Sequence, residues 1–395
     1  MKKNIIRFLF AAVCTAVLWQ YTGCRDNADI DDTTSYANPI TDYEADPWIY
    51  HHTDGYFYYT ATYSDFDRII IRKAETINLL RTASETDLLT ANSGILAGTA
   101  YEYIWAPELH YINGVWYLFF SASTSSSSDW TIRQFAAECT DSDPVEGTWE
   151  LKGQIGSSII NTFSVDGTVF KVNNQWYYVW SQYIFDGGTY DEDGDSSNDS
   201  VTVNGTVYSD VAGNSTGWAC LFIAKTTSDD FTTITDPTIV SVPQYDWECG
   251  QDTSICTHTS ANVNVNEGPA VLNRNGKVFI VYSASGCDES YCMGMLTADE
   301  DDDLCDMSSW SKSGSPVFTT SVTNSVYGPG HCSFTTDGDY DVIVYHARRY
   351  AGLYDSTSAN LDDTTTDGLS DPNRSARAKV FTWNSDGTPN FGTAE

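Results

Sequence analysis

The sequence predicts an all-β fold, a five-bladed β-propeller, from its composition and from one repeated pattern. Aromatic residues make up 14% of the chain, which favours strands, and helical periodicity is nearly absent. A hairpin plan of strand, tight turn and aromatic strand recurs along the 395 residues. Because each such unit can bury its faces only against its neighbours, the repeat predicts a closed ring of blades.

The repeated hairpins begin near residues 46, 108, 166, 268 and 331. Each joins two apolar runs through a turn that contains Asn or Asp, usually followed by Gly. In chain order they span residues 48–61, 110–121, 168–180, 270–282 and 330–346. The longest interval contains Asp186–Asn214, which we interpret as an acidic surface loop. Within it, Asp191–Asp195 resembles a calcium loop with a misplaced Gly, so either solvated charge or a bound ion explains it.

The N-terminal residues have the pattern of a targeting segment. Basic residues, Lys2 among them, flank the apolar run Ile5–Trp19, which is too short for a stable membrane span. We therefore predict a signal peptide over residues 1–24, cleaved either as an ordinary signal or as a lipoprotein signal with Cys24 acylated. The protein is then secreted or, alternatively, lipid-anchored at the cell surface. Residues 25–41 are polar and predict a flexible leader, and residues 42–395 predict a single propeller domain.

Charge and cysteine content limit the partners and the compartment. The formal net charge is −34 with only 20 Lys and Arg, which argues against nucleic acid and against membrane contact beyond a lipid anchor. A neutral ligand is therefore expected. Eight cysteines follow Cys24, an even number that favours disulfides in an exported chain. Cys249 with Cys256 and Cys287 with Cys292 are close enough in sequence for local pairs, although sequence does not fix the connectivity.

Three carboxylates occupy similar settings in the repeat: Asp46 before Pro47, Asp166 before Gly167, and Glu267 before Gly268. The innermost strands of a propeller start around its axis, so we expect these three side chains to converge there. Two or three carboxylates at one point suit the cleavage of a glycosidic bond, in which one is a protonated acid and another an ionised base. Burial and like charge separate their pKa values, so that one kind of group serves both roles.

Five motifs in order resemble glycoside hydrolase family 43. They are Ala45-Asp46-Pro47-Trp48, Trp105-Ala106-Pro107-Glu108-Leu109, Ser164-Val165-Asp166-Gly167-Thr168, Asn266-Glu267-Gly268-Pro269-Ala270 and Tyr327-Gly328-Pro329-Gly330-His331. Each motif alone is weak, whereas five in order, over most of the chain, are specific. The resemblance implies a five-bladed propeller that hydrolyses arabinose- or xylose-containing substrates with inversion of configuration.

By motif match, the resemblance implies Asp46 as the general base and Glu267 as the general acid. Asp166 would tune the pKa of the acid and orient it. Inversion requires the carboxyls of the base and the acid to lie about 6.5–9.5 Å apart, which leaves room for the attacking water.

The resemblance also implies three further residues. Trp105 is a sugar-stacking platform or, alternatively, a core side chain between blades. Arg348 contacts a sugar hydroxyl or forms a salt bridge. His331 matches the family's axial histidine, which contacts a calcium or sodium ion in the central channel, or it is a buried structural histidine. No cofactor is expected to take part in the chemistry itself.

We therefore expect a monomeric enzyme that releases terminal α-L-arabinofuranosyl units from a neutral plant polysaccharide, arabinan or arabinoxylan. The tail 371–389 resembles the closing segment of arabinofuranosidase-type members. β-Xylosidase and endo-1,5-α-L-arabinanase activities stay open, as does a catalytically silent carbohydrate-binding propeller. Trp247-Glu248-Cys249 resembles the acid motif of fructan-cleaving propellers, but the chain lacks their Arg-Asp-Pro motif.

Overall fold

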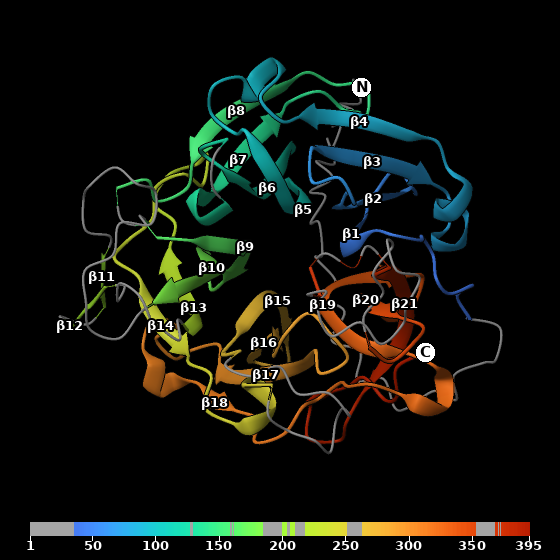
Figure 1. Ribbon diagram of the computed structural model, residues 1–395, viewed down its shortest axis with the longest axis vertical. Helices are drawn as coiled ribbons and strands as arrows, with labels where there is room; N and C mark the ends of the chain where they lie inside the picture. Colours follow the sequence, from blue (N-terminus) through green and yellow to red (C-terminus); the bar gives the residue numbers. More distant parts are fainter. Residues whose placement is uncertain are drawn as a thin grey trace, which may run out of the picture.

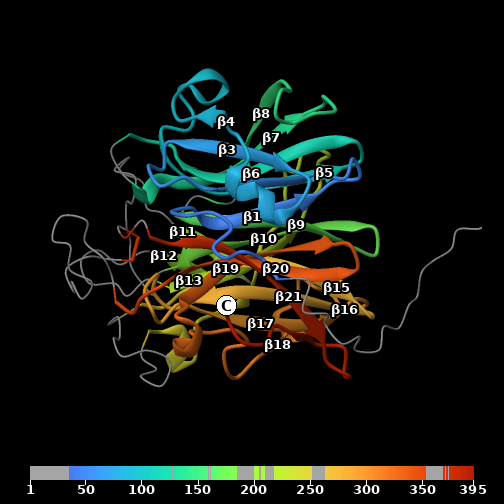
Figure 2. The same cartoon turned by 90° about the vertical axis from the view of Figure 1, so that its right-hand side faces the viewer.

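The computed structural model describes residues 35–126, 129–158, 160, 162–184, 200–203, 206–209, 218–250, 263–352, 368–369, 371 and 373–395. Over these residues, five antiparallel sheets of four strands surround one axis, and the first strand of each sheet is innermost (Figure 1). The view turned by 90° shows the first two sheets of the chain in its upper half and the last two in its lower half (Figure 2). The prediction of an all-β, five-bladed propeller is confirmed.

Each blade is built from strands that are consecutive or nearly so in the chain, ordered from the axis outward. Blade 1 contains β1 (Ala45–His51), β2 (Phe57–Thr62), β3 (Arg68–Ala74) and β4 (Glu85–Thr90); blade 2 contains β5 (Glu102–Ile112), β6 (Val115–Ser123), β7 (Ile132–Cys139) and β8 (Trp149–Gln154). Blade 3 contains β9 (Ser164–Val172), β10 (Gln175–Ile184), β13 (Trp218–Lys225) and β14 (Thr238–Ser241). Blade 4 contains β15 (Asn266–Arg274), β16 (Lys277–Ala284), β17 (Cys292–Asp299) and β18 (Ser311–Lys312); blade 5 contains β19 (Tyr327–Asp337), β20 (Tyr340–Arg348), β21 (Ser375–Trp383) and β22 (Pro389–Asn390).

Short 3-10 helices lie in the connections, at η1 (Ile77–Thr82), η2 (Gly94–Leu96), η3 (Asp129–Thr131), η4 (Asp246–Glu248), η5 (Met307–Ser309) and η6 (Val322–Asn324). The predicted closing segment forms β21 and β22, which complete blade 5.

The apolar core lies between the blades. The buried side chains of the described residues form five clusters, each shared by two neighbouring blades. Leu118 of blade 2, for example, shares a cluster with Ile71 of blade 1. Val344 of blade 5 shares another with Ile49 of blade 1, and this cluster closes the ring. No blade could bury these faces alone, as the repeat predicted.

The segment just before blade 1 also closes the ring. Ile40 and Thr41 are each 1% exposed, and their backbones hydrogen-bond to Ala376 of β21. Asn38 Oδ1 accepts from the amide of Ala378, and its Nδ2 donates to the carbonyl of Ala378. The last residues of the predicted flexible leader are therefore part of the propeller, because they supply an edge for the outer side of β21.

Every innermost strand contains a bulge near its start, and each bulge has a residue in the left-handed region, where φ is positive. These residues are Asp46, Ala106, Asp166, Gly268 and His331, with φ between 44° and 60°. A bulge re-aims the side chains next to it. All five bulges therefore direct residues toward the axis at the same level of the ring.

The bulges are linked from blade to blade by hydrogen bonds. The amide of the left-handed residue donates to a polar side chain on the second strand of the preceding blade. Four such bonds run from Ala106 to Thr62 Oγ1, Asp166 to Ser121 Oγ, His331 to Ser283 Oγ and Asp46 to His346 Nδ1. At the fifth junction, the amide of Gly268 donates instead to Asp166 Oδ2 (3.1 Å), and Ser181 Oγ donates to the carbonyl of Asn266.

The structure also corrects the prediction of a long acidic surface loop and leaves the N-terminal predictions untested. Part of the interval interpreted as a surface loop forms a two-stranded sheet, β11 (Ser200–Val203) with β12 (Thr206–Ser209). The signal was Asn204-Gly205 between β-branched runs, which is a hairpin pattern. Residues 1–34 and the calcium-like stretch 191–195 lie outside the described residues. Within the described residues, no helix is both long and apolar enough to span a membrane.

The cysteine predictions have mixed outcomes. Cys287 carries a free thiol, so its predicted local pair with Cys292 is not formed. Cys249 also carries a free thiol, while Cys256 lies outside the described residues. Free thiols are likewise present at Cys139, Cys220, Cys305 and Cys332. Disulfides therefore remain a prediction from composition.

Candidate active site

The structure brings the predicted carboxylates together at the axis. His331 Nδ1 lies 3.1 Å from Asp46 Oδ1 and 3.8 Å from Asp166 Oδ2, and Asp166 accepts a hydrogen bond from the residue after Glu267. Asp46 and Asp166 occupy the left-handed position of their bulges. Glu267 lies one residue earlier, because Gly268 takes that position in β15. The expected equivalence of position in the repeat therefore holds for Asp46 and Asp166, whereas Glu267 lies one residue before the equivalent position.

Asp46 is a buried carboxylate held in its ionised form. Its Oδ2 accepts from Thr62 Oγ1 at 2.6 Å, and its Oδ1 faces Arg374 Nη1 at 3.9 Å. Burial alone would raise the pKa of Asp46, but the nearby positive charge of His331 holds it well below its usual range. On its other side, burial lowers the pKa of His346 to about 4, so this imidazole is neutral and accepts the amide hydrogen of Asp46.

Asp166 and Glu267 have the opposite tendency. Burial, assisted by the charges of Glu267 and Asp46, raises the pKa of Asp166 to about 7. Burial also raises the pKa of Glu267, with the carboxylate of Asp46 adding to the effect. The hydroxyl of Tyr291 donates to Glu267 Oε1 at 2.7 Å and partly opposes this rise. One ionised carboxylate thus faces two that retain a proton more readily.

His331 supplies the positive charge at the centre of the site. Burial opposes its protonation, but the carboxylates of Asp46 and Asp166 outweigh burial and raise its pKa to about 10. An imidazolium donates hydrogen bonds and does not ligate a cation. Among the described residues, no group of three or more His, Cys, Asp or Glu side chains is arranged to hold a metal ion. The calcium or sodium contact of His331 implied by the resemblance stays a prediction.

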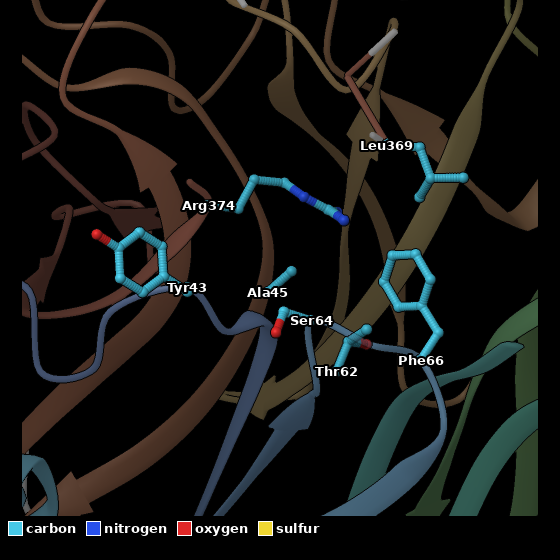
Figure 3. A pocket seen from close by; sticks show the side chains of 7 residues that line it. All are labelled: Tyr43, Ala45, Thr62, Ser64, Phe66, Leu369 and Arg374. Atoms are coloured by element: carbon cyan, nitrogen blue, oxygen red, sulfur yellow. The ribbon is translucent and has the colours of Figure 1, made fainter. Parts of the chain in front are cut away.

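A pocket of about 90 Å³ opens beside Asp46. Its lining residues are Tyr43, Ala45, Thr62, Ser64, Phe66, Leu369 and Arg374 (Figure 3). Figure 3 shows the guanidinium end of Arg374 pointing across the pocket toward Leu369 and Phe66. Arg374 is 6% exposed, and its Nε has no hydrogen-bond partner among the described residues. A buried donor of this kind fits a sugar hydroxyl.

The two predicted substrate-binding residues have different environments. Trp105 is half-buried at the start of its bulge and contacts Phe66 edge-on, with ring centroids 5.7 Å apart. Arg348 is 1% exposed; its Nε donates to Asp371 Oδ2 at 2.9 Å and its Nη2 donates to the carbonyl of Gly368 at 2.7 Å. Arg374 thus lines the pocket, whereas Arg348 is engaged in a buried ion pair.

Glu248, from the motif that resembles fructan-cleaving enzymes, has a structural role. Its carboxylate is fully buried and accepts from Asn266 Nδ2, Tyr282 and Lys312 Nζ at 2.7–2.9 Å, as well as from two backbone amides. This network anchors Asn266, the residue before Glu267. The arrangement holds β15 in place and leaves Glu248 without access to substrate.

A family model for glycosyl hydrolases family 43 matches residues 36–214 and 201–389. The chain belongs to glycoside hydrolase family 43. An extracellular exo-α-(1→5)-L-arabinofuranosidase of Streptomyces avermitilis is 39% identical over 99% of this chain and 70% of its own length. An α-L-arabinofuranosidase of Humicola insolens is 36% identical over 97% of this chain and 68% of its own.

A solved structure agrees with these relatives. The α-L-arabinofuranosidase from Lactobacillus brevis superposes with a TM-score of 0.72 at 39% identity, over 91% of this chain and 97% of that one. The family 43 resemblance predicted from the five motifs is therefore confirmed. The chain is a glycoside hydrolase of the α-L-arabinofuranosidase type.

Sequence reasoning missed Thr62, Tyr291 and Arg374. Thr62 had a signal, since a Ser or Thr lies at or near the end of the second strand in the first four blades. These residues are Thr62, Ser121, Ser181 and Ser283, and all but Ser181 accept the amide of the next bulge. Tyr291 had no such signal, because it lies just before β17 and outside the repeated hairpin of β15 and β16. Arg374 was seen only as part of the closing segment.

The Tyr291 hydroxyl yields a prediction for the pH profile. It stabilises the ionised form of Glu267, so Tyr291→Phe should raise the pKa of Glu267 further. Activity that needs protonated Glu267 then persists to higher pH. We expect the alkaline limb of kcat/KM against pH to move upward by about one unit, while the acidic limb stays in place. An alkaline limb that stays fixed or moves to lower pH would contradict this role.

Proposed function

We propose that the chain is an exo-acting α-L-arabinofuranosidase that cleaves terminal α-L-arabinofuranosyl units from neutral arabinan or arabinoxylan with inversion. One observation carries the proposal: Asp46 is ionised, whereas burial raises the pKa values of Glu267 and Asp166. A hydrolase of this kind needs a base and an acid at the same pH. The names of the relatives favour arabinose as the released sugar.

The roles follow from these protonation states. Asp46 accepts a proton from water, which attacks the anomeric carbon. Glu267 donates its proton to the leaving oxygen on the opposite side. Asp166 accepts the amide hydrogen of Gly268, which positions the neighbouring acid, and an ionised Glu267 raises the pKa of Asp166, so the two carboxyls do not readily ionise together. The pocket beside Asp46 accepts the terminal furanose, with Arg374 donating to one of its hydroxyls.

Product analysis tests the sugar, the mode of attack and the stereochemistry together. With a linear α-1,5-arabinan oligosaccharide, proton NMR should show free arabinose as the first product, initially as the β-anomer. Longer oligosaccharides as first products would contradict exo attack. An initial α-anomer would mean retention and would remove Asp46 from the role of base.

Substitutions at the two carboxylates should separate the acid from the base. Glu267→Gln should lower kcat on arabinan oligosaccharides about 10²–10⁴-fold, because the leaving alkoxide loses its proton donor. The loss should be much smaller with 2,4-dinitrophenyl α-L-arabinofuranoside, whose leaving group needs no proton. Steady-state kinetics on both substrates measures the difference.

Asp46→Asn is the matched control, because a lost base slows attack by water whatever the leaving group. We expect similar losses on both substrates for this variant. If Glu267→Gln lost as much activity on the dinitrophenyl substrate as on the oligosaccharide, Glu267 would not be the acid.

We also propose that hydrolysis needs no metal ion, since Asp46 and Glu267 can supply the base and the acid. Dialysis against EDTA and assay in sodium-free buffer should leave kcat/KM and the melting temperature unchanged. A loss that added calcium or sodium restores would overturn this proposal and return His331 to the role of an ion ligand.

A further inference from the structure

Exposed aromatic side chains are concentrated at the catalytic end of the propeller. Of the aromatic residues that the structure describes, only Tyr43 and Trp130 rank as exposed, at 56% and 37%. Tyr43 lines the pocket beside Asp46. Trp130 lies on the other side of blade 2, against Phe163, which precedes β9 and Asp166.

Between these two points runs a chain of ring contacts that we name the aromatic arc, comprising Phe66, Trp105, Phe163, Trp130 and Tyr183. The ring centroids of Phe66 and Trp105 are 5.7 Å apart, and those of Trp105 and Phe163 are 6.4 Å apart. The Phe163 centroid lies 5.4 Å from the centroids of Trp130 and of Tyr183, which are 5.5 Å from each other. Phe66 lines the pocket, so the arc begins where the terminal sugar binds.

The arc ends beside the general acid. Tyr183 lies two residues after Ser181 on β10, and Ser181 Oγ donates to the carbonyl of Asn266, the residue before Glu267. In an inverting reaction, water enters on the side of Asp46 and the leaving oxygen lies on the side of Glu267. The part of the substrate beyond the cleaved bond therefore begins near Tyr183.

The arc is not part of the core. Among the described residues, the five interblade clusters take most of the buried aromatic side chains, and none of the arc's members belongs to them. Phe66, Trp105, Phe163 and Tyr183 are half-buried and Trp130 is exposed. The indole nitrogen of Trp105 also has no acceptor among the described residues. Side chains placed this way cost free energy in water unless a ligand covers them.

We propose that the far part of the aromatic arc, formed by Phe163, Trp130 and Tyr183, binds the leaving part of the substrate, two or more neutral sugar units that continue from the cleaved bond along blades 2 and 3. The proposal rests on the proposed function and adds how the enzyme recognises a chain rather than a single terminal sugar. Sugar rings present apolar faces that stack on Trp and Tyr, while their hydroxyls stay in water. The net charge of −34 disfavours an acidic polysaccharide as the ligand.

Trp130→Ala tests the proposal, because its exposed side chain can be removed without disturbing the core. We expect kcat/KM for arabinotetraose to fall about tenfold through KM, as for the loss of one aromatic contact. Turnover of α-L-arabinofuranosyl fluoride, which has no sugar on the leaving side, should stay within about twofold of the parent. Trp130→Phe should recover part of the loss.

Met307→Ala is the matched control. Met307 is another exposed apolar side chain, at 47%, and it lies in η5 before β18, the outermost strand of blade 4. This variant should match the parent on both substrates, and melting temperatures should confirm that both variants fold.

The outcomes separate this proposal from the proposed function. If the parent hydrolyses neither substrate, the proposed function fails. If the parent is active and Trp130→Ala keeps the parent's kcat/KM on arabinotetraose, the arc does not bind the leaving chain. If Trp130→Ala instead converts a dimer to a monomer in light scattering, without a chain-length effect, the arc is an interface between copies and the proposal is overturned.

Discussion

The site depends on one repeated constraint, a bulge with a left-handed residue at the start of every innermost strand. In four of the five blades, the amide of that residue donates to a polar side chain on the second strand of the preceding blade, whereas Asp166 lies on the first strand of its blade. The fifth amide, from Gly268, turns to Asp166 instead. This deviation lies next to Glu267, the proposed acid, because Glu267 directly precedes Gly268. The repeated hydrogen bond between blades is thus replaced, at this one junction, by a bond that links Asp166 to the residue after Glu267.

The second determinant is the balance of buried charge. A single imidazolium, His331, lies within 4 Å of two carboxylates. It cannot compensate three negative charges, so the carboxylate nearest to it ionises most readily while the others retain a proton more easily. The separation into base and acid follows from geometry rather than from different chemical groups. Arg374 adds positive charge next to Asp46 and strengthens the same asymmetry.

Local patterns predicted the ring and most of the site. Turn residues and aromatic alternation located the innermost hairpin of every blade but missed the β11–β12 hairpin. The motifs located Asp46, Asp166 and Glu267, because these features lie in adjacent residues. The sequence could not reveal which arginine faces the pocket, since Arg348 and Arg374 differ only in the partners that tertiary packing brings to them. The offset of Glu267 depends on which residue adopts positive φ, and a Gly after the Glu was the visible signal. The leader was misjudged at its end because its pairing partner, β21, lies more than 300 residues later.

The contacts between blade 1 and blade 5, which close the ring, have a consequence for biogenesis. Asp46 belongs to the first strand, yet the imidazole that receives its amide comes from a residue 300 positions later. The cationic neighbours of Asp46, namely His331 and Arg374, also come from the last blade. Contacts so distant in sequence form late in folding. A nascent or truncated polypeptide without blade 5 would therefore contain Asp46, Asp166 and Glu267 but lack the groups that keep the proposed base ionised, so activity would require the complete propeller.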